Sequence, residues 1–599
     1  MRFFFLLTSL ISLLIVSCTT RETHLDNMSL ATLFNKYYDE RMQLLPIEST
    51  LNGDSLNNDK LYAYFTDSYS GKLRNFFSRY LATIQTFNRD QLNENDRDSY
   101  DIFKTEMEMS LEGLSVGYFN DYFPEYHFIP FTQNGGIPLL IGQFGTGTGT
   151  QPFKSVKNYD DWQKRAATFS AWTDSAIVYF RKGMDANAVL PEALVKKMIP
   201  QMDAMLVADE TKSLFYEPIN RLPETFSETD KKRLTRDYRK LIQEQLIPSY
   251  KKLSHFLKTE YLAKARTSSG IGVTPEGVDQ YNFLIRYHTT TRQTSEEIYQ
   301  TGLSEVQRIG HAMDSLKNSV GFTGDRQAFF QFMKTEKKFM PFKTPEDILN
   351  AYRAVQARIA PNLKKMFNHE PKAKFEIRQT EAFRAASGGP EYVQGTPDGE
   401  RPGIFYVPII NAKTYTSIGM EALFLHEAIP GHHYQISLQV ENEKLPEFRR
   451  FINYSAYGEG WGLYAETLGK ELGVYSDPYQ YMGALVKEMH RAIRLVVDVS
   501  IHSKGMTREQ AIHYMMENEP LSEPIATAEI ERYMAIPGQA LSYKIGQLKI
   551  DELRKKYENQ LGNKFNLAAF HDKILEGGSM PLGILEKKMD EWATRQTKR

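Results

Sequence analysis

A proline–glycine pair within a histidine-rich segment places the strictest condition on how this chain can fold. Residues 426–433 read His-Glu-Ala-Ile-Pro-Gly-His-His and follow an apolar run, which predicts a helix that enters the segment. Proline has no amide hydrogen to donate inside a helix, and glycine accepts backbone dihedrals that other residues avoid. We therefore expect the helix to bulge at Pro430-Gly431, in the manner of the π-type bulges found at functional sites.

The spacing of the histidines indicates a metal site. In the His-Glu-x-x-His motif, histidines at positions i and i+4 of a helix bind zinc, and the glutamate is the general base. Here His426 and Glu427 begin the segment, but i+4 is Pro430 and the next histidines are His432 and His433. On an unbroken helix His433 would lie roughly 10 Å from His426 along the axis. A bulge would instead bring His432 to the usual i+4 place; three unrelated surface histidines are the alternative interpretation.

A second segment offers the carboxylate ligand that such a site needs. Residues 457–462 read Tyr-Gly-Glu-Gly-Trp-Gly within a helical pattern. Each glycine costs a helix about 1 kcal/mol relative to alanine, so we expect a neighbouring helix to approach closely. Glu459 is then predicted to be a buried carboxylate that a cation would neutralise. Glu466, seven residues later on the same face, could orient a ligand. A solvated glutamate in a loop is the alternative for Glu459.

Further along, charged residues recur at helical spacing. Arg491, Arg494, Asp498 and His502 form one stripe, opposite apolar residues. One interpretation is a solvated face with an Arg494–Asp498 pair; the other makes His502 and an arginine contacts for a substrate or an oxyanion. Tyr543 lies in a predicted helix and is either structural or a hydrogen-bond donor to the oxyanion of a tetrahedral intermediate.

The first residues of the chain predict export and a lipid anchor. Residues 3–16 carry no charge but are too few to span a membrane. They end in Ile-Val-Ser-Cys, which resembles a bacterial lipobox, and Cys18 is the one cysteine of the chain. We therefore expect a signal peptide over 1–17, lipidation of Cys18, a tether over 18–28 and a location in the cell envelope. The net charge of −1 gives no electrostatic case for nucleic acid.

The remaining chain, 29–599, is predicted to be one mostly α domain. Apolar periodicity indicates helices up to about residue 370 and again after 417, and the clearest of the earlier helices are expected over 159–183, 228–265, 294–318 and 345–367. We expect an N-terminal lobe over 29–370 and a catalytic lobe over 371–599. The glycine-rich residues 142–150 predict a surface loop or a lid over a substrate.

The stretch from 371 to 411 has a pattern typical of strands and turns rather than of helices. Residues 374–378 alternate with period two, residues 403–409 form a β-rich run, and turn-forming residues lie between them. This pattern predicts a small antiparallel sheet beside the histidine segment, with Pro408 on an edge strand. An exposed edge would allow an extended peptide to pair with the sheet.

Five segments together resemble the bacterial domain-of-unknown-function family 885. They are 401–407 (Arg-Pro-Gly-Ile-Phe-Tyr-Val), 421–435, 459–461, 494–502 and 539–546. Members of that family are similar in fold to the Taq-type metallocarboxypeptidases and, more distantly, to thimet oligopeptidase and neurolysin. The resemblance implies a large helical fold with a deep cleft and a small sheet beside one Zn²⁺ ion.

The resemblance also implies roles for single residues. His426 matches the first zinc ligand, Glu427 the general base and Glu459 the later glutamate ligand. His432 is favoured over His433 as the second ligand, because the residue after Pro-Gly-His is not always histidine in this family.

Further roles are expected around this centre, and those of Tyr543 and His502 are carried over by the resemblance. Tyr543 and His502 match groups that assist the oxyanion, and Arg491, Arg494 and Tyr406 are expected to contact the substrate. Asp498, with His433 and Glu466, is expected to orient or replace a ligand. The expected function is zinc-dependent hydrolysis of short peptides; another metal-dependent amide or ester hydrolase, or a lipoprotein that binds peptides or glycans without chemistry, are the alternatives.

Overall fold

Helices make up most of the chain, as the apolar periodicity predicts. The computed structural model describes residues 29–120, 123–381, 389–396 and 401–598, and 68% of the protein is helical. The predicted signal peptide, Cys18 and the tether lie outside the described residues. Within the described part, no helix combines the length and the apolar character that crossing a membrane requires.

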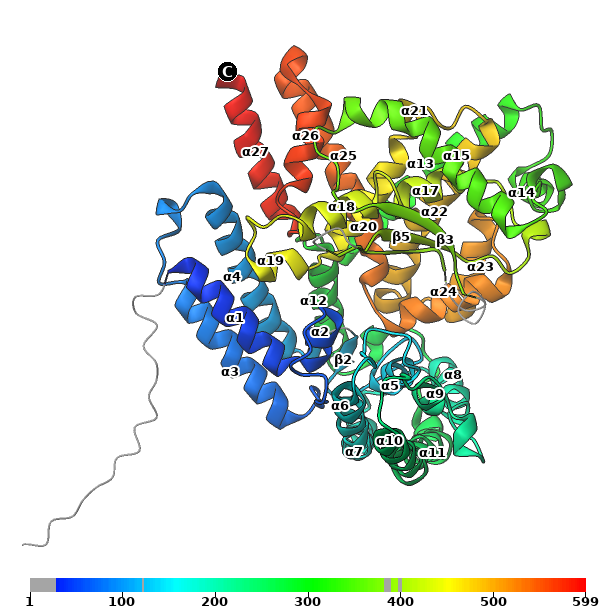
Figure 1. Cartoon of the computed structure of the whole chain (residues 1–599). Coiled ribbons are helices and arrows are strands. Elements are labelled where there is room, and N and C mark those ends of the chain that lie inside the picture. The colour runs from blue at the N-terminus through cyan, green and yellow to red at the C-terminus, as the bar shows by residue number, and fades with distance from the viewer. Residues whose placement is uncertain (1–28, 121–122, 382–388, 397–400, 599) are drawn as a thin grey trace, which may run out of the picture.

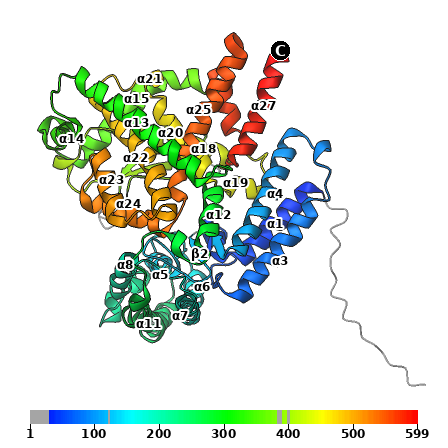
Figure 2. The same ribbon diagram turned by 180° about the vertical axis from the view of Figure 1, so that it is seen from behind.

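The helices form three groups along the chain (Figure 1). The first group is α1 (Leu30–Leu44), α2 (Pro46–Leu51), α3 (Asp67–Ile84) and α4 (Glu94–Ser115). The second is α5 (Ile137–Gly145), α6 (Val156–Ala167), α7 (Phe169–Asp185), α8 (Glu192–Asp203), α9 (Glu217–Asn220), α10 (Glu228–Leu241) and α11 (Ile247–Phe256). Both views show these two groups as separate clusters of helices, with the hairpin of β1 (Tyr118–Asn120) and β2 (Pro124–Tyr126) near their junction (Figures 1 and 2).

The third group contains the rest of the chain. Its first helices are α12 (Gly277–Thr289), α13 (Ser295–Ser319), α14 (Arg326–Thr335) and α15 (Pro345–Met366). After the sheet come α17 (Met420–Glu427), α18 (His432–Val440), α19 (Glu447–Phe451), α20 (Ser455–Thr467), α21 (Gly469–Leu472), α22 (Pro478–Ser503), α23 (Arg508–Asn518), α24 (Glu523–Ala535), α25 (Ser542–Leu561), α26 (Leu567–Leu575) and α27 (Leu582–Lys598). The structure has helices over most of each range in which they were predicted, namely 159–183, 228–265, 294–318 and 345–367.

The apolar interior does not divide at residue 370. One core joins α1, α3 and α4 to α15, α17, α20 and the C-terminal helices, and a second joins the α6–α11 group to α22 and α24. Helix α13 packs along α22, and α15 packs against α17 and the sheet. Both cores therefore cross the boundary that we expected between an N-terminal and a catalytic lobe.

The small sheet is mixed, which corrects the predicted antiparallel arrangement. Its strands are β3 (Phe375–Gln379), β4 (Glu391–Val393) and β5 (Gly403–Val407), in the spatial order β3-β5-β4. The two strands predicted from the sequence, β3 and β5, pair in parallel, and β4 pairs antiparallel to β5. The short β4 lies in the stretch interpreted as turns. Pro408 was expected to lie on an edge strand. It instead directly follows β5, which is the central strand of the sheet.

The glycine-rich stretch is partly helical. Helix α5 extends through Gly145, and residues after it turn at the surface. A side chain at Gly145 would meet the ring of Phe215 at 2.3 Å, so close packing requires this glycine. The predicted surface loop is thus confined to residues 146–150.

Candidate metal centre

The helix that enters the histidine segment ends there, and a new helix begins two residues after the proline. Helix α17 ends at Glu427, and α18 begins at His432. The Ile429–Pro430 peptide bond is cis. A Cβ on Gly431 would lie 1.9 Å from the carbonyl oxygen of His426, so only glycine fits this position. The segment is therefore a break between two helices, which corrects the expectation of a π-type bulge in one helix.

This break brings His432 to His426. The two imidazole rings lie 4.9 Å apart between centroids, nearly perpendicular to each other. Oε2 of Glu459, on α20, lies 3.4 Å from Nε2 of His426 and 3.6 Å from Nε2 of His432. One ligand atom from each of these three residues lies within 4.8 Å of the others. The structure thus assembles a His-His-Glu group close enough to hold a metal ion.

The glycines of α20 allow this approach. A Cβ on Gly462 would lie 2.8 Å from Cε1 of His426, so the missing side chain leaves room for the imidazole. A Cβ on Gly460 would lie 2.5 Å from the backbone of Gly546, where α20 packs against α25. The close helix contact predicted from these glycines is therefore present. The side chain of Glu459 is 25% exposed and lines a cavity, so it is half-buried rather than buried as we expected.

Glu466 holds the far side of the His426 ring. Its Oε1 lies 2.9 Å from Nδ1 of His426, and both side chains are almost fully buried. Burial lowers the pKa of His426, but the hydrogen bonds with Glu459 and Glu466 outweigh it and raise that pKa to about 9. Burial likewise raises the pKa of Glu459, but hydrogen bonds with His426 and His432 hold it well below its usual value. Glu466 favours a proton on Nδ1 of His426 and Glu459 favours one on Nε2, and a metal cation held by Glu459 and His432 would compete with the proton for Nε2.

His433 points away from this group. Its Nδ1 lies 2.9 Å from the hydroxyl of Tyr392 on β4 and 3.4 Å from Oγ of Ser437. Its ring packs against Phe375 of β3. Burial lowers its pKa to about 4. The geometry therefore gives His432 the place beside His426 and Glu459, and gives His433 a contact with the sheet.

A cavity opens above the three residues. Glu427, Arg491, Arg494 and Tyr543 line it together with the His-His-Glu group. Part of its wall is the edge strand β4, which contributes Glu391 and Tyr392, and another part is α18. Glu427 is half-buried at the end of α17. The expected general base and the expected oxyanion donor thus face the same space as the expected ligands.

Arg494 packs over the Tyr543 ring and keeps one nitrogen for a substrate, because its Nη1 is buried and has no hydrogen-bond partner among the described residues. Its guanidinium carbon lies 4.4 Å from the centre of the Tyr543 ring. Its nitrogens donate to the Tyr533 hydroxyl at 2.9 Å and to Glu529 at 3.1 Å. Arg491 also lines the cavity, where its Nη1 donates to the backbone of Lys487. Both arginines expected to bind substrate therefore keep a nitrogen without a hydrogen-bond partner among the described residues, Nη1 in Arg494 and Nε in Arg491.

Asp498 and His502 do not belong to the site, which corrects the prediction for both. Asp498 accepts hydrogen bonds from the Tyr281 hydroxyl at 2.6 Å and from the amide of Gly538 at 3.1 Å. Nδ1 of His502 accepts from the amide of Ile271, so Nε2 donates to a backbone carbonyl. Both side chains are buried, and neither lines the cavity.

The Arg494–Asp498 pair, which belonged to the alternative interpretation of this stripe, is not formed either, because each side chain has other partners. The stripe on α22 is not a solvated face, because Asp498 accepts hydrogen bonds from Tyr281 of α12 and from Gly538 after α24. Tyr406, on β5 opposite Glu391, is not among the residues that line the cavity. Its expected contact with substrate therefore has no support in the geometry.

Sequence reasoning missed three residues beside the centre. Glu529 of α24 binds Arg494, and Tyr392 of β4 binds His433. Lys487 lies one turn before Arg491 on α22; burial lowers its pKa, and the charges of Glu466 and Glu427 act on it in the opposite direction. The spacing of Lys487 from Arg491 was a usable signal, whereas nothing in the local sequence distinguishes Glu529.

Solved structures of two bacterial proteins are similar to this chain over most of its length. The chain is similar to a solved protein from Colwellia psychrerythraea described as "the putative lipoprotein", with 26% identity, a TM-score of 0.86, and coverage of 94% of this chain and 99% of that one. It is similar in fold to "a putative lipoprotein of unknown function" from Shewanella oneidensis, with 20% identity, a TM-score of 0.73, and coverage of 94% and 100%. No curated protein matches the chain.

The sequence profile of one family extends over nearly the whole described chain. It matches residues 46–589, which include every residue of the His-His-Glu group and the cavity wall around it. The chain therefore belongs to the family described as "Bacterial protein of unknown function (DUF885)".

Proposed function

We propose that this protein is a zinc-dependent peptidase that hydrolyses short peptides. The observation that carries the proposal is the convergence of His426, His432 and Glu459 on one point, with Glu427 in the same cavity. Two imidazole nitrogens and one carboxylate oxygen are a common ligand set of catalytic zinc, and they leave a coordination position open. A structural zinc site would instead use four protein ligands.

The residues around the centre suit a hydrolytic role. Zn²⁺ bound by this ligand set would activate a water molecule and polarise the scissile carbonyl. In the proposed mechanism, the carboxylate of Glu427 takes the proton from the attacking water and passes it to the leaving amine. The hydroxyl of Tyr543, held through its ring by Arg494, donates a hydrogen bond to the carbonyl oxygen as negative charge develops there.

The strand β4 supports a peptide as the substrate. It is an edge strand of its sheet, and Glu391, Tyr392 and Gln394 line the cavity. An extended peptide can pair with such an edge through main-chain hydrogen bonds, which are independent of the peptide's sequence. We therefore propose that β4 aligns the substrate backbone across the metal centre.

We further propose that Cys18 carries the lipid that anchors the protein in the cell envelope. The lipobox-like sequence before Cys18 supports this, as does the description of the Colwellia psychrerythraea neighbour as "the putative lipoprotein". Stable anchoring requires more than one acyl chain, which a lipidated N-terminal cysteine provides.

The function is tested by incubating purified protein with a panel of peptides and acyl esters after chelation and after readdition of zinc. We expect peptide cleavage that disappears with the chelator and returns with about one equivalent of zinc per chain. Cleavage of esters alone would favour the alternative hydrolase. A protein that binds peptides yet cleaves neither class would be a non-catalytic lipoprotein.

A first consequence concerns Glu466. Replacing it with glutamine removes the negative charge 2.9 Å from Nδ1 of His426. Carboxylate partners of ligating histidines fix the ring and raise its basicity, so we expect zinc affinity to fall by about 10–100-fold. Competition with a fluorescent chelator measures this change. Glu471→Gln, on the neighbouring helix α21, is the matched control and should leave the affinity unaltered.

A further inference from the structure

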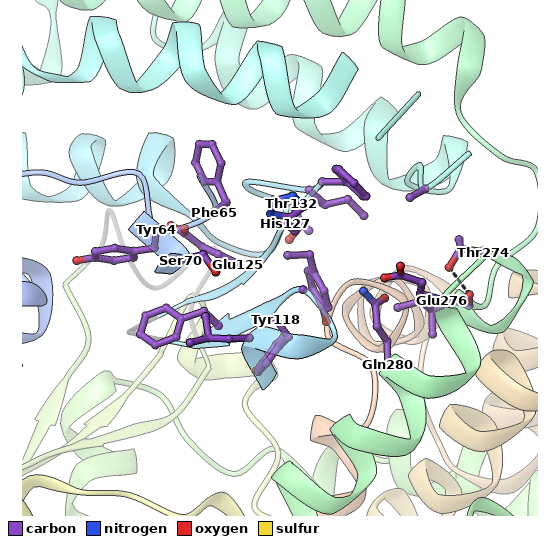
Figure 3. Close-up of a pocket in the computed structure, with 18 of the residues that line it drawn as sticks. Tyr64, Phe65, Ser70, Tyr118, Glu125, His127, Thr132, Thr274, Glu276 and Gln280 are labelled. Atoms are coloured by element: carbon purple, nitrogen blue, oxygen red, sulfur yellow. Dashed lines mark hydrogen bonds between the residues drawn. The ribbon is translucent and has the colours of Figure 1, made fainter. Parts of the chain in front are cut away.

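A second cavity lies at the junction of the three helix groups. Its volume is about 420 Å³, within the range of sites for small molecules. Its walls come from the start of α3, the β1–β2 hairpin, the start of α12 and the end of α24, and it shares no lining residue with the metal cavity. Figure 3 shows residues that line this hollow, among them Tyr64 and Phe65 from the segment before α3 and Gln280 from α12.

The walls of this junction cavity are rich in aromatic and aliphatic side chains. Phe65 and Phe119 contribute rings, and Leu190 and Met534 contribute aliphatic surface. Each of these residues is less than 9% exposed, so the wall is fixed by packing in the protein core. A ligand with an apolar body would be removed from water on entering, which favours binding in proportion to the apolar surface that it buries.

The cavity also contains a cation without an acidic partner. Nε of Arg266 donates to the carbonyl oxygen of Val189 at 2.9 Å, and Nη1 donates to the carbonyl oxygen of Ser268. Among the described residues, no carboxylate forms an ion pair with this guanidinium, and its Nη2 makes no hydrogen bond to them. Burial lowers the pKa of Arg266 to about 10. Two neutral carbonyls hold the side chain in place but leave its positive charge uncompensated.

The acidic residues of the same cavity are already engaged or solvated. Asp67 accepts from Lys182 at 3.0 Å and from the Tyr179 hydroxyl at 2.8 Å. Glu125 is buried and interacts within the protein, and Glu276 is exposed to water. The charge that a ligand could satisfy is therefore positive, and Nη2 of the half-buried Arg266 is the nitrogen left to donate a charge-assisted hydrogen bond to a carboxylate.

We propose that the junction cavity is a second binding site, separate from the metal centre, for a small carboxylate with an apolar body. The carboxylate binds the guanidinium of Arg266, and the apolar body packs against the aromatic wall. An N-acylated hydrophobic amino acid has this chemistry. The site does not depend on the proposed hydrolytic function, because none of its residues lies at the metal centre.

The test uses the full chain after removal of metal with a chelator, so that the result is independent of hydrolysis. Isothermal titration calorimetry compares N-acetylphenylalanine with its uncharged carboxamide. Hydrogen bonds to charged groups contribute about 1.5–3 kcal/mol, so we expect the acid to bind at least about tenfold more tightly than the amide. Arg266→Gln should abolish that difference.

Two further variants keep the test decisive. Ser70→Trp places a large ring at a half-buried position of the cavity wall and should weaken binding of both compounds. Arg236→Gln, on the exposed face of α10, is the matched control and should bind as the unaltered protein does. Thermal unfolding checks that each variant is folded. Equal binding of acid and amide, binding unchanged in both Arg266→Gln and Ser70→Trp, or no binding of either compound would overturn the proposal.

Discussion

Replacing Glu427 with glutamine is expected to lower kcat for peptide hydrolysis by about 10²–10⁴-fold, the usual contribution of a general base. The amide has nearly the shape of the carboxylate but cannot accept the proton of the attacking water at neutral pH. The substitution leaves the proposed ligands in place, because Glu427 is not a member of the His-His-Glu group. Steady-state kinetics on a peptide that the unaltered protein cleaves will measure the effect.

Zinc content separates a loss of chemistry from a loss of the centre. We expect Glu427→Gln to retain about one zinc per chain and to bind substrate with little change. Glu443→Gln, in the exposed turn after α18, is the matched control and should leave kcat unaltered. If the Glu427→Gln protein kept full zinc and full kcat, another group would have to be the base, and the mechanism proposed here would fail.

The fold was predictable to the extent that its elements are local. A helix with an apolar stripe shows apolar residues at helical spacing in the sequence. Most of the helix positions predicted from that spacing were therefore correct. The pairing of the sheet was not predictable, because it depends on which strands meet. The run at 374–378 alternates with period two, and the run at 403–409 is rich in β-forming residues. Neither pattern depends on whether the partner strand is parallel or antiparallel. The missing information was β4, three residues long and surrounded by turn-forming sequence.

The site was predictable where one helix carries the information. Glu459 and Glu466 lie seven residues apart, which is close to two turns, so their common face could be inferred. Both do meet the ring of His426. The break at Pro430-Gly431 was inferred from backbone chemistry, but its form was not. Whether it ended in a bulge or in two helices depends on contacts such as that between Trp461 and the carbonyl of Pro430.

Asp498 and His502 show why a polar stripe on a helix is ambiguous. The residues recur at helical spacing, and that pattern indicates a common face without indicating what the face contacts. Here α22 is enclosed, and the stripe meets buried partners on α12 and after α24. The burial raises the pKa of Asp498 to about 7. These groups have a structural role that no local signal distinguishes from a role in a binding site.

The adjacent histidines give the second large effect. Replacing His432 with alanine removes one of the three proposed ligand atoms, and two remaining ligands hold zinc poorly. We expect zinc affinity to fall by more than the roughly 100-fold limit that is typical of losing an orienting partner. Hydrolysis should be lost with the metal. Zinc content after gel filtration, measured by atomic emission, and the affinity from chelator competition will give both quantities.

His433→Ala is the matched comparison, because it changes the same residue type one position away. Its imidazole contacts Tyr392 and Phe375 rather than the metal group. Losing that hydrogen bond should cost about 1 kcal/mol of the free energy of unfolding, while zinc content stays near that of the unaltered protein. The opposite pattern, with zinc lost from His433→Ala and kept by His432→Ala, would mean that the ligand set is wrong. It would also require the break at Pro430-Gly431 to turn α18 so that His433 replaces His432 beside His426.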